Sequence, residues 1–153
     1  MKGRRLLLYF LGLFGLLALA GSAQAALQAQ ETSLAAGGTA YEVNLDSHSV
    51  LWVSDANAGE IRAVSAASGA YTIYPVGGAP SDARGDGAGT AWWADFGSNK
   101  LSRLTTGNNK VTTWEIPGST GLYSTGIDSS GDVWVSDYYA AFLYELDPDG
   151  NGL

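Results

Sequence analysis

Leu51-Trp52-Val53-Ser54-Asp55 is the stretch that decides the fold, because the chain repeats it twice, as Ala91-Trp92-Trp93-Ala94-Asp95 and Val133-Trp134-Val135-Ser136-Asp137. The first tryptophans of the three copies stand 40 and 42 residues apart. A fixed period of this length is typical of a repeat protein, in which each copy forms one small structural unit.

The same spacing recurs at other positions of the repeat. An Asp stands six residues before each of these tryptophans. Apolar residues stand nine and twelve residues after each tryptophan. These columns are Asp46, Asp86 and Asp128; Ile61, Leu101 and Leu143; and Val64, Leu104 and Leu146. Their agreement predicts that the three copies fold alike.

Each copy is predicted to contain four short strands separated by turns. The tryptophan strand is apolar at consecutive positions, which indicates burial on both faces. Third strands are predicted at 60–64, 100–104 and 142–146, and fourth strands at 71–76 and 111–116. A four-stranded sheet of about forty residues covered by copies of itself is a propeller blade. We therefore expect an all-β fold, a partial β-propeller of about three four-stranded blades in an open arc, with about eleven strands.

The predicted blades span about 39–77, 78–117 and 118–153, and the last is expected to be incomplete because Leu153 falls where its outer strand would begin. Residues 26–38 are rich in Ala, Gln and Gly and are predicted to be a flexible lead-in. Three blades do not close a ring, since propellers carry about four to eight. Two interpretations stay open: a truncated piece of a longer propeller, or a small propeller that oligomerises.

The N-terminus has the three parts of a signal peptide. Basic residues come first, an apolar run extends from Leu6 to Ala20, and the small-residue exit is Ala23-Gln24-Ala25. This order predicts a signal peptide at 1–25 and a secreted or periplasmic protein. The alternative is an uncleaved membrane anchor, which would be the chain's only contact with a membrane.

Charge excludes one class of partner. Removal of residues 1–25 leaves five basic residues against fifteen acidic ones, a net charge near −10. Nucleic-acid binding needs clustered Lys and Arg, so a nucleic-acid partner is not expected. The chain has no cysteine, so its stability must come from packing.

The repeat resembles that of virginiamycin B lyase, also called streptogramin lyase. The likeness rests on the turn Asp, the 133–137 strand, the ending Glu145-Leu146-Asp147-Pro148, and the similar ending Thr113-Trp114-Glu115-Ile116-Pro117. It covers roughly Tyr41 to Pro148. The resemblance implies a seven-bladed propeller that opens cyclic streptogramin B antibiotics by Mg²⁺-assisted carbon–oxygen elimination.

The resemblance also implies site residues. The family's histidine base corresponds to a column that holds Tyr41, Ser81 and Tyr123, so these are candidates for the channel mouth but none is the base. The family's acidic, metal-linked position corresponds to Asp55, Asp95 and Asp137, and Mg²⁺ is implied only in this way. The alternative is that each Asp caps the turn that follows it. The single histidine, His48, lies outside the column and is interpreted as a solvated turn residue. No catalytic residue is assigned.

Two functions are therefore expected from the sequence. One is a lyase-like propeller whose full-length form carries out elimination on a cyclic ester, the fragment itself being inactive. The other is a non-catalytic secreted propeller that binds a small molecule, peptide, protein or carbohydrate at its channel mouth.

Overall fold

The structure is a computed structural model that describes residues 31–34 and 38–147. It holds eleven strands and no helix in these ranges. The strands are β1 (Glu42–Leu45), β2 (Val50–Asp55), β3 (Glu60–Ser65), β4 (Tyr71–Pro75), β5 (Pro80–Gly85), β6 (Thr90–Asp95), β7 (Lys100–Thr105), β8 (Lys110–Glu115), β9 (Leu122–Ile127), β10 (Val133–Asp137) and β11 (Phe142–Leu146). The predicted signal peptide and most of the lead-in lie outside the described residues.

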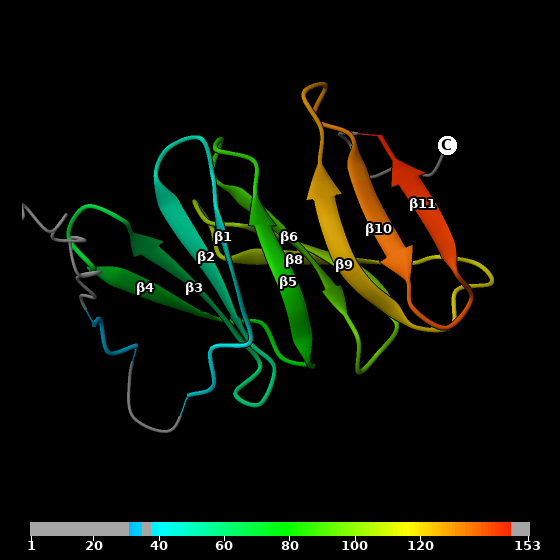
Figure 1. The fold of residues 1–153 in the computed structure, drawn as a ribbon, viewed down its shortest axis with the longest axis horizontal. Coiled ribbons are helices and arrows are strands. Elements are labelled where there is room, and N and C mark those ends of the chain that lie inside the picture. Colours follow the sequence, from blue (N-terminus) through cyan, green and yellow to red (C-terminus); the bar gives the residue numbers. More distant parts are fainter. Residues whose placement is uncertain (1–30, 35–37, 148–153) are drawn as a thin grey trace, which may run out of the picture. The chain divides into compact units, whose positions relative to one another are not determined.

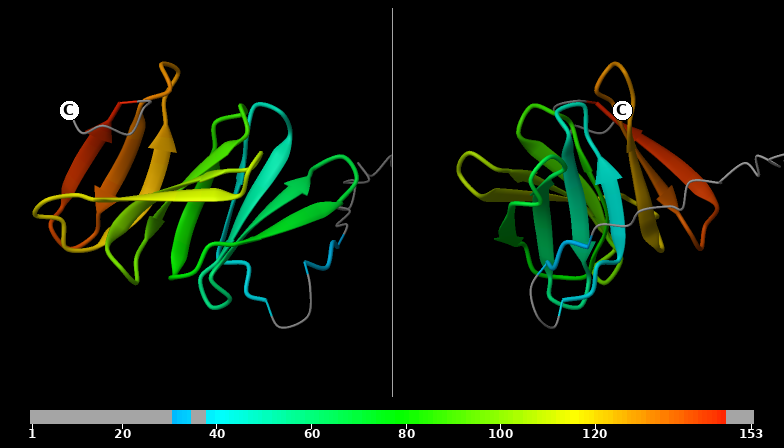
Figure 2. Two further views of the ribbon diagram at one scale, coloured as in Figure 1. Left: turned by 180° about the vertical axis from the view of Figure 1, so that it is seen from behind. Right: turned by 60° about the vertical axis from the view of Figure 1, so that its left-hand side comes forward.

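The strands form three antiparallel sheets in which each strand pairs with its neighbour in sequence (Figure 1). Blade 1 has the order β1-β2-β3-β4, blade 2 has β5-β6-β7-β8, and blade 3 has β9-β10-β11. Two further views show the same succession of sheets (Figure 2). The all-β class and the three propeller blades predicted from the repeat are confirmed. In the described part of the chain, no helix is long and apolar enough to span a membrane.

The inner strands β1, β5 and β9 place successive blades against one another, since β1 and β2 contact β5, and β5 and β6 contact β9. Two apolar clusters fill the joints. The first is Trp52, Ile61, Ala83, Ala91, Trp93 and Leu104. The second is Trp92, Ala94, Leu101, Leu122, Val133, Val135 and Leu146. The repeated tryptophan of blades 1 and 2 therefore packs into the blade that follows it.

In blades 1 and 3 the turn Asp binds the tryptophan of its own repeat, which explains the fixed spacing between the two residues. One carboxylate oxygen of Asp46 accepts the backbone N–H groups of His48 at 2.8 Å and Val50 at 3.0 Å, which closes the β1–β2 hairpin. The other oxygen accepts the Trp52 indole N–H at 2.9 Å. Asp128 binds the Trp134 indole in the same way at 3.1 Å. In blades 1 and 3 this Asp thus fixes both the hairpin and the indole, whereas Asp86 of blade 2 closes its hairpin in the same way but accepts the Thr90 hydroxyl in place of an indole.

The turn after each tryptophan strand requires a left-handed backbone at one position. Gly59, Asn99 and Ala141 occupy it with φ angles of 66°, 57° and 56°. Glycine and asparagine adopt this conformation readily, whereas alanine pays about 1–2 kcal/mol for it.

We expect Ala141→Gly to raise the free energy of unfolding by about 0.5–1 kcal/mol, because relief of the left-handed strain exceeds the added flexibility of the unfolded chain. Urea titration measures the change. The matched control is Ala140→Gly, at a neighbouring residue without positive φ; it should lower stability by about the same amount. If both substitutions lowered the free energy of unfolding by the same amount, Ala141 would not be strained.

Candidate functional site

The rim is the edge of the blades at which the inner strands begin and the tryptophan strands end. The structure brings the three predicted channel-mouth residues together there. The Tyr41 and Tyr123 hydroxyls lie 3.2 Å apart, although they belong to blades 1 and 3. The Ser81 hydroxyl lies 2.7 Å from the Tyr123 carbonyl oxygen and 2.9 Å from that of Ala94. The hydrogen bond between the Tyr41 and Tyr123 hydroxyls is the main cause that raises the pKa of Tyr123 from 10 to about 12.

Three further aromatic side chains join Tyr41 and Tyr123 at the rim. The Phe96 ring lies 5.8 Å from the Tyr123 ring and 6.1 Å from that of Tyr139, between centroids. Tyr138 lies 5.8 Å from Tyr123 and 5.2 Å from Tyr139. Tyr138 and Tyr139 are 69% and 66% exposed. We call the five side chains the rim aromatic cluster.

Sequence reasoning missed three members of this cluster. Phe96 and Tyr138 each follow the Asp that ends a tryptophan strand, and Tyr139 comes next. The available signal was the position directly after that Asp, where blade 1 has Ala56.

Behind the cluster lies a buried carboxylate, Asp82 of β5, which has a left-handed φ of 43° at a bulge in the strand. Its partners come from all three inner strands. The Asn44 amide donates to it at 2.6 Å, and the Thr125 backbone N–H at 2.9 Å. The Ser124 hydroxyl also donates, and the Arg84 Nε lies 3.2 Å away. Buried, strained acids of this kind concentrate at functional sites.

Glu42 of β1 shares this environment. Burial, a hydrogen bond to Asp82 and the Asp82 charge together raise the pKa of Glu42 from 4.5 to about 7. Burial by itself raises the pKa of Asp82 too, but donors that include Ser124 and Glu42, together with the charge of Arg84, outweigh it and lower that pKa. Near pH 7 the Glu42 carboxyl is therefore partly protonated, next in sequence to Tyr41 of the rim. Glu42, Asp82 and Ser124 form one repeat column, adjacent to the predicted mouth column.

We expect Glu42→Gln to remove a pH dependence of stability. Because the folded pKa of Glu42 exceeds 4.5, its contribution is fully present below about pH 4.5 and is lost as pH rises through about 7. Because the side chain is partly exposed, we expect the free energy of unfolding of the wild type to fall by about 1 kcal/mol from this source as the pH rises through about 7. The variant should lack this decrease. Urea titrations of wild type and variant across this range measure it. Parallel stability curves for the two proteins would contradict the assignment.

The Asp residues of the predicted metal column accept hydrogen bonds from backbone N–H groups. Asp55 accepts the backbone N–H groups of Thr39 at 2.8 Å and Ala58 at 2.9 Å, and it lies 2.9 Å from the Arg62 guanidinium. Burial alone raises the pKa of Asp55, but these donors and the Arg62 charge outweigh it and lower the pKa. A carboxylate already paired with a guanidinium is a poor Mg²⁺ ligand.

Asp95 and Asp137 have the same arrangement. Asp95 accepts the backbone N–H of Ser98, in the turn after its strand, and that of Ala79, in the segment that leads into its blade. Asp137 accepts the backbone N–H groups of Ala140 and Thr120 from the corresponding turn and segment. The geometry favours the turn-capping interpretation. Asp55, Asp95 and Asp137 do not fit a shared Mg²⁺ site, and no step is assigned to the metal.

Other candidate groups lie away from the rim. His48 sits in the β1–β2 turn, at the opposite end of blade 1, with its Nδ1 3.3 Å from the Ser47 hydroxyl. Among the described residues, one group of three acidic side chains has carboxylate oxygens within 4.8 Å of one another: Asp128, Asp132 and Glu145. This group lies in blade 3, also at the end away from the rim. Asp128 is already occupied by its turn and by the Trp134 indole.

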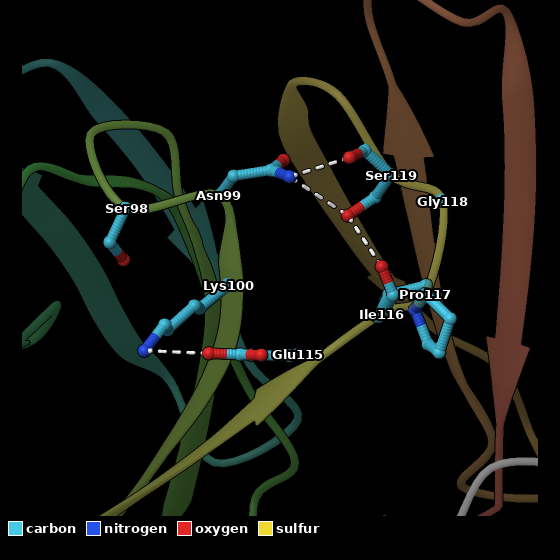
Figure 3. A pocket seen from close by; sticks show the side chains of 8 residues that line it. All are labelled: Ser98, Asn99, Lys100, Glu115, Ile116, Pro117, Gly118 and Ser119. Carbon is cyan, nitrogen blue, oxygen red and sulfur yellow. Dashed lines mark hydrogen bonds and ion pairs between the residues drawn. The ribbon is translucent and has the colours of Figure 1, made fainter.

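A pocket of about 410 Å³ lies where blade 2 connects to blade 3 (Figure 3). The Asn99 amide crosses it and donates to the Ser119 carbonyl oxygen at 2.8 Å and hydroxyl at 2.9 Å, while its oxygen accepts the Leu122 N–H. Lys100 and Glu115 pair along its side at 3.3 Å. These contacts fix the connection between the blades, so we assign the pocket a structural role.

Comparison with known proteins supports the fold. The sequence matches no protein-family model and no curated protein. The structure is similar to a streptogramin B lyase structure, with a TM-score of 0.70 and 20% identity over 80% of this chain and 42% of that one. It is also similar to virginiamycin B lyase from Staphylococcus aureus, with a TM-score of 0.63 and 19% identity over 74% of this chain and 39% of that one.

Two further structures are similar. An inactive variant of the Staphylococcus aureus lyase with quinupristin gives a TM-score of 0.60 and 20% identity, over 71% of this chain and 38% of that chain. A protein of unknown function from Bacteroides caccae gives a TM-score of 0.55 and 15% identity, over 72% of this chain and 46% of that one. The chain thus spans less than half the length of these structures. It has the fold of part of a β-propeller of the virginiamycin B lyase type.

Proposed function

We propose that this chain is an exported propeller segment whose rim binds a small organic molecule or a peptide without transforming it. The observation that carries the proposal is the rim aromatic cluster, whose outer members Tyr138 and Tyr139 are two-thirds exposed. Tyrosine offers a large, rigid contact surface at low entropic cost. Protein and carbohydrate surfaces are the other ligands that such a cluster suits.

The absence of a suitable base at the mouth column supports binding over catalysis. Tyr41, Ser81 and Tyr123 are linked by hydrogen bonds, and the pKa of Tyr123, raised to about 12, makes its phenolate form scarcer still near pH 7. The export part of the proposal rests on the signal-like segment at 1–25.

The first test is a calorimetric titration of the full chain with quinupristin, a probe taken from the similar lyase structure. We expect saturable binding that the double variant Tyr138→Ser/Tyr139→Ser weakens at least about tenfold, because central aromatic contacts dominate such sites. The matched control is Tyr71→Ser, which replaces an exposed tyrosine at the opposite end of blade 1. Unchanged affinity in the double variant, or equal loss in the control, would refute the rim as the binding site.

Carbon–oxygen elimination on a cyclic ester is the second candidate function, favoured by the likeness to the lyase structures and by Glu42, whose pKa of about 7 suits a proton acceptor. Elimination opens the ring without a change of mass, whereas hydrolysis adds one water. Liquid chromatography with mass detection, with and without Mg²⁺, separates these outcomes. We expect intact quinupristin to be recovered; an opened isomer of unchanged mass would overturn the non-catalytic proposal.

A further inference from the structure

Two rows of polar side chains cross the inner strands β1, β5 and β9, one behind the other. The outer row is the predicted channel-mouth column, and the inner row, one residue further along the chain in each blade, consists of Glu42, Asp82 and Ser124. Both rows are joined from blade to blade. In the outer row the Tyr41 hydroxyl lies 3.2 Å from that of Tyr123. Because neighbouring residues share one backbone, a displacement of the inner row also displaces the outer row.

Asp82 is the centre of the inner row and is 0% exposed. From β9 it accepts the Ser124 hydroxyl and the Thr125 backbone N–H. From β1 it is hydrogen-bonded to Glu42, and the Asn44 amide donates to it further along the same strand. An ionised carboxylate only accepts hydrogen bonds, so the link to Glu42 exists only while one of the two carboxyl groups carries a proton. That proton therefore joins β1 to β5 at the residue that adjoins the rim.

Loss of this proton places two negative charges in contact. Burial, with the hydrogen bond and the charge of Asp82, raises the pKa of Glu42 to about 7, and the charge of Arg84 opposes this rise without cancelling it. From β9, the titratable group within reach of the Glu42 charge is Tyr123, whose pKa the pairing of the two hydroxyls raises most and the Glu42 charge raises further. On β2 the residue opposite is Ser54, which carries no charge. The repulsion is relieved when this end of β1 moves away from β5, and that movement separates the two tyrosines of the outer row.

We propose that Glu42 is a positioning residue of the rim: with its proton it holds Tyr41 against Tyr123, and without that proton the contact opens and the rim binds its ligand more weakly. The inference rests on the proposed function and adds the regulation of the same site. Because the pKa of Glu42 is about 7, the change is expected between about pH 6 and about pH 8. Histidine is the other side chain that commonly changes charge in this range. The chain's single histidine, His48, lies in the β1–β2 turn at the opposite end of blade 1.

The first measurement needs no ligand. NMR spectra of the full chain report the contact between the Tyr41 and Tyr123 rings as cross-peaks between their ring protons. For the wild type we expect these cross-peaks at about pH 6 and much weaker ones at about pH 8. Glu42→Gln should keep them at both values, because its amide donates to Asp82 whether the solution is acidic or basic. Glu42→Ala, which removes the link, should show weak cross-peaks at both. Wild-type cross-peaks that do not change with pH would overturn the proposal.

The second measurement is calorimetric titration of the full chain with quinupristin at the same two pH values. The wild type should bind about fivefold more weakly at the higher pH, a typical size for coupling between two sites. Glu42→Gln should lose this difference and keep the tighter affinity, and Glu42→Ala should show the weaker affinity at both values. Any titration of quinupristin itself affects every protein equally, so it cancels when the variants are compared with the wild type.

Two variants serve as controls. Glu115→Gln removes an acid whose side chain is 81% exposed, and His48→Gln removes the histidine; both should keep the wild-type pH profile. A Glu42→Gln variant with the same profile as the wild type would overturn the proposal. Failure of quinupristin to bind at either pH would refute the proposed function instead, and the ring contact measured by NMR would then decide the role of Glu42.

Discussion

Replacement of Gly85 by alanine is expected to destabilise the chain by about 3 kcal/mol, in the range that overpacking of a closed core produces. A Cβ at this position would lie 2.6 Å from Cδ1 of the Trp52 indole and closer still to its Nε1. Trp52 would then have to leave the joint between blades 1 and 2 and give up its bond to Asp46. Urea unfolding, followed by tryptophan fluorescence, measures both the loss of stability and the movement of the indole.

Gly107→Ala is the matched control, because a Cβ there meets no atom within 4 Å and the residue has no positive φ. Its effect should stay within about 0.5 kcal/mol. A second check is the variant Trp52→Phe, in which Gly85→Ala should cost less than about half as much, because the smaller ring no longer reaches the added methyl. A full penalty in that background would show that Gly85 acts through something other than the indole.

Loss of the Asp82 carboxylate is the second large effect that we expect. Asp82→Ala would leave the Asn44 amide, the Ser124 hydroxyl and the Thr125 N–H without their acceptor, and would leave Arg84 without its counter-charge. Removing one partner from a buried, charged network costs about 3–5 kcal/mol. Urea titration near pH 7 should show a loss in this range, together with weaker cohesion of the three inner strands.

Asp82→Asn provides the comparison. Asparagine tolerates the left-handed φ of 43° and keeps one acceptor oxygen, so we expect about half the loss seen with alanine. NMR titration of the Glu42 carboxyl gives an independent readout: its pKa should fall part of the way from about 7 toward 4.5 in both variants, because burial remains while the Asp82 charge is gone. An Asp82→Ala variant within about 1 kcal/mol of wild type would show that the network is not a source of stability.

The rim shows how far sequence reasoning reached. It identified Tyr41, Ser81 and Tyr123 as one column, and the structure does gather them. It did not identify the pair of Glu42 and Asp82, which are 40 residues apart and belong to different blades. Their contact depends on how one blade packs against the next, which the pattern of neither strand predicts. For Asp55, Asp95 and Asp137 it offered a metal and a turn cap as alternatives; backbone donors from two separate segments favour the cap.

The sequence by itself determined the blades and their order. Hairpin turns, strand lengths and the burial of the tryptophan strand all depend on contacts within one repeat or with a similar neighbouring repeat, so a period of about forty residues suffices to predict them. The tertiary structure alone decided which side chains from different repeats meet: Glu42 with Asp82, and the members of the rim aromatic cluster. These features arise where the repeat is broken by different residues in one column, and their energies depend on distances and burial that only packed blades define.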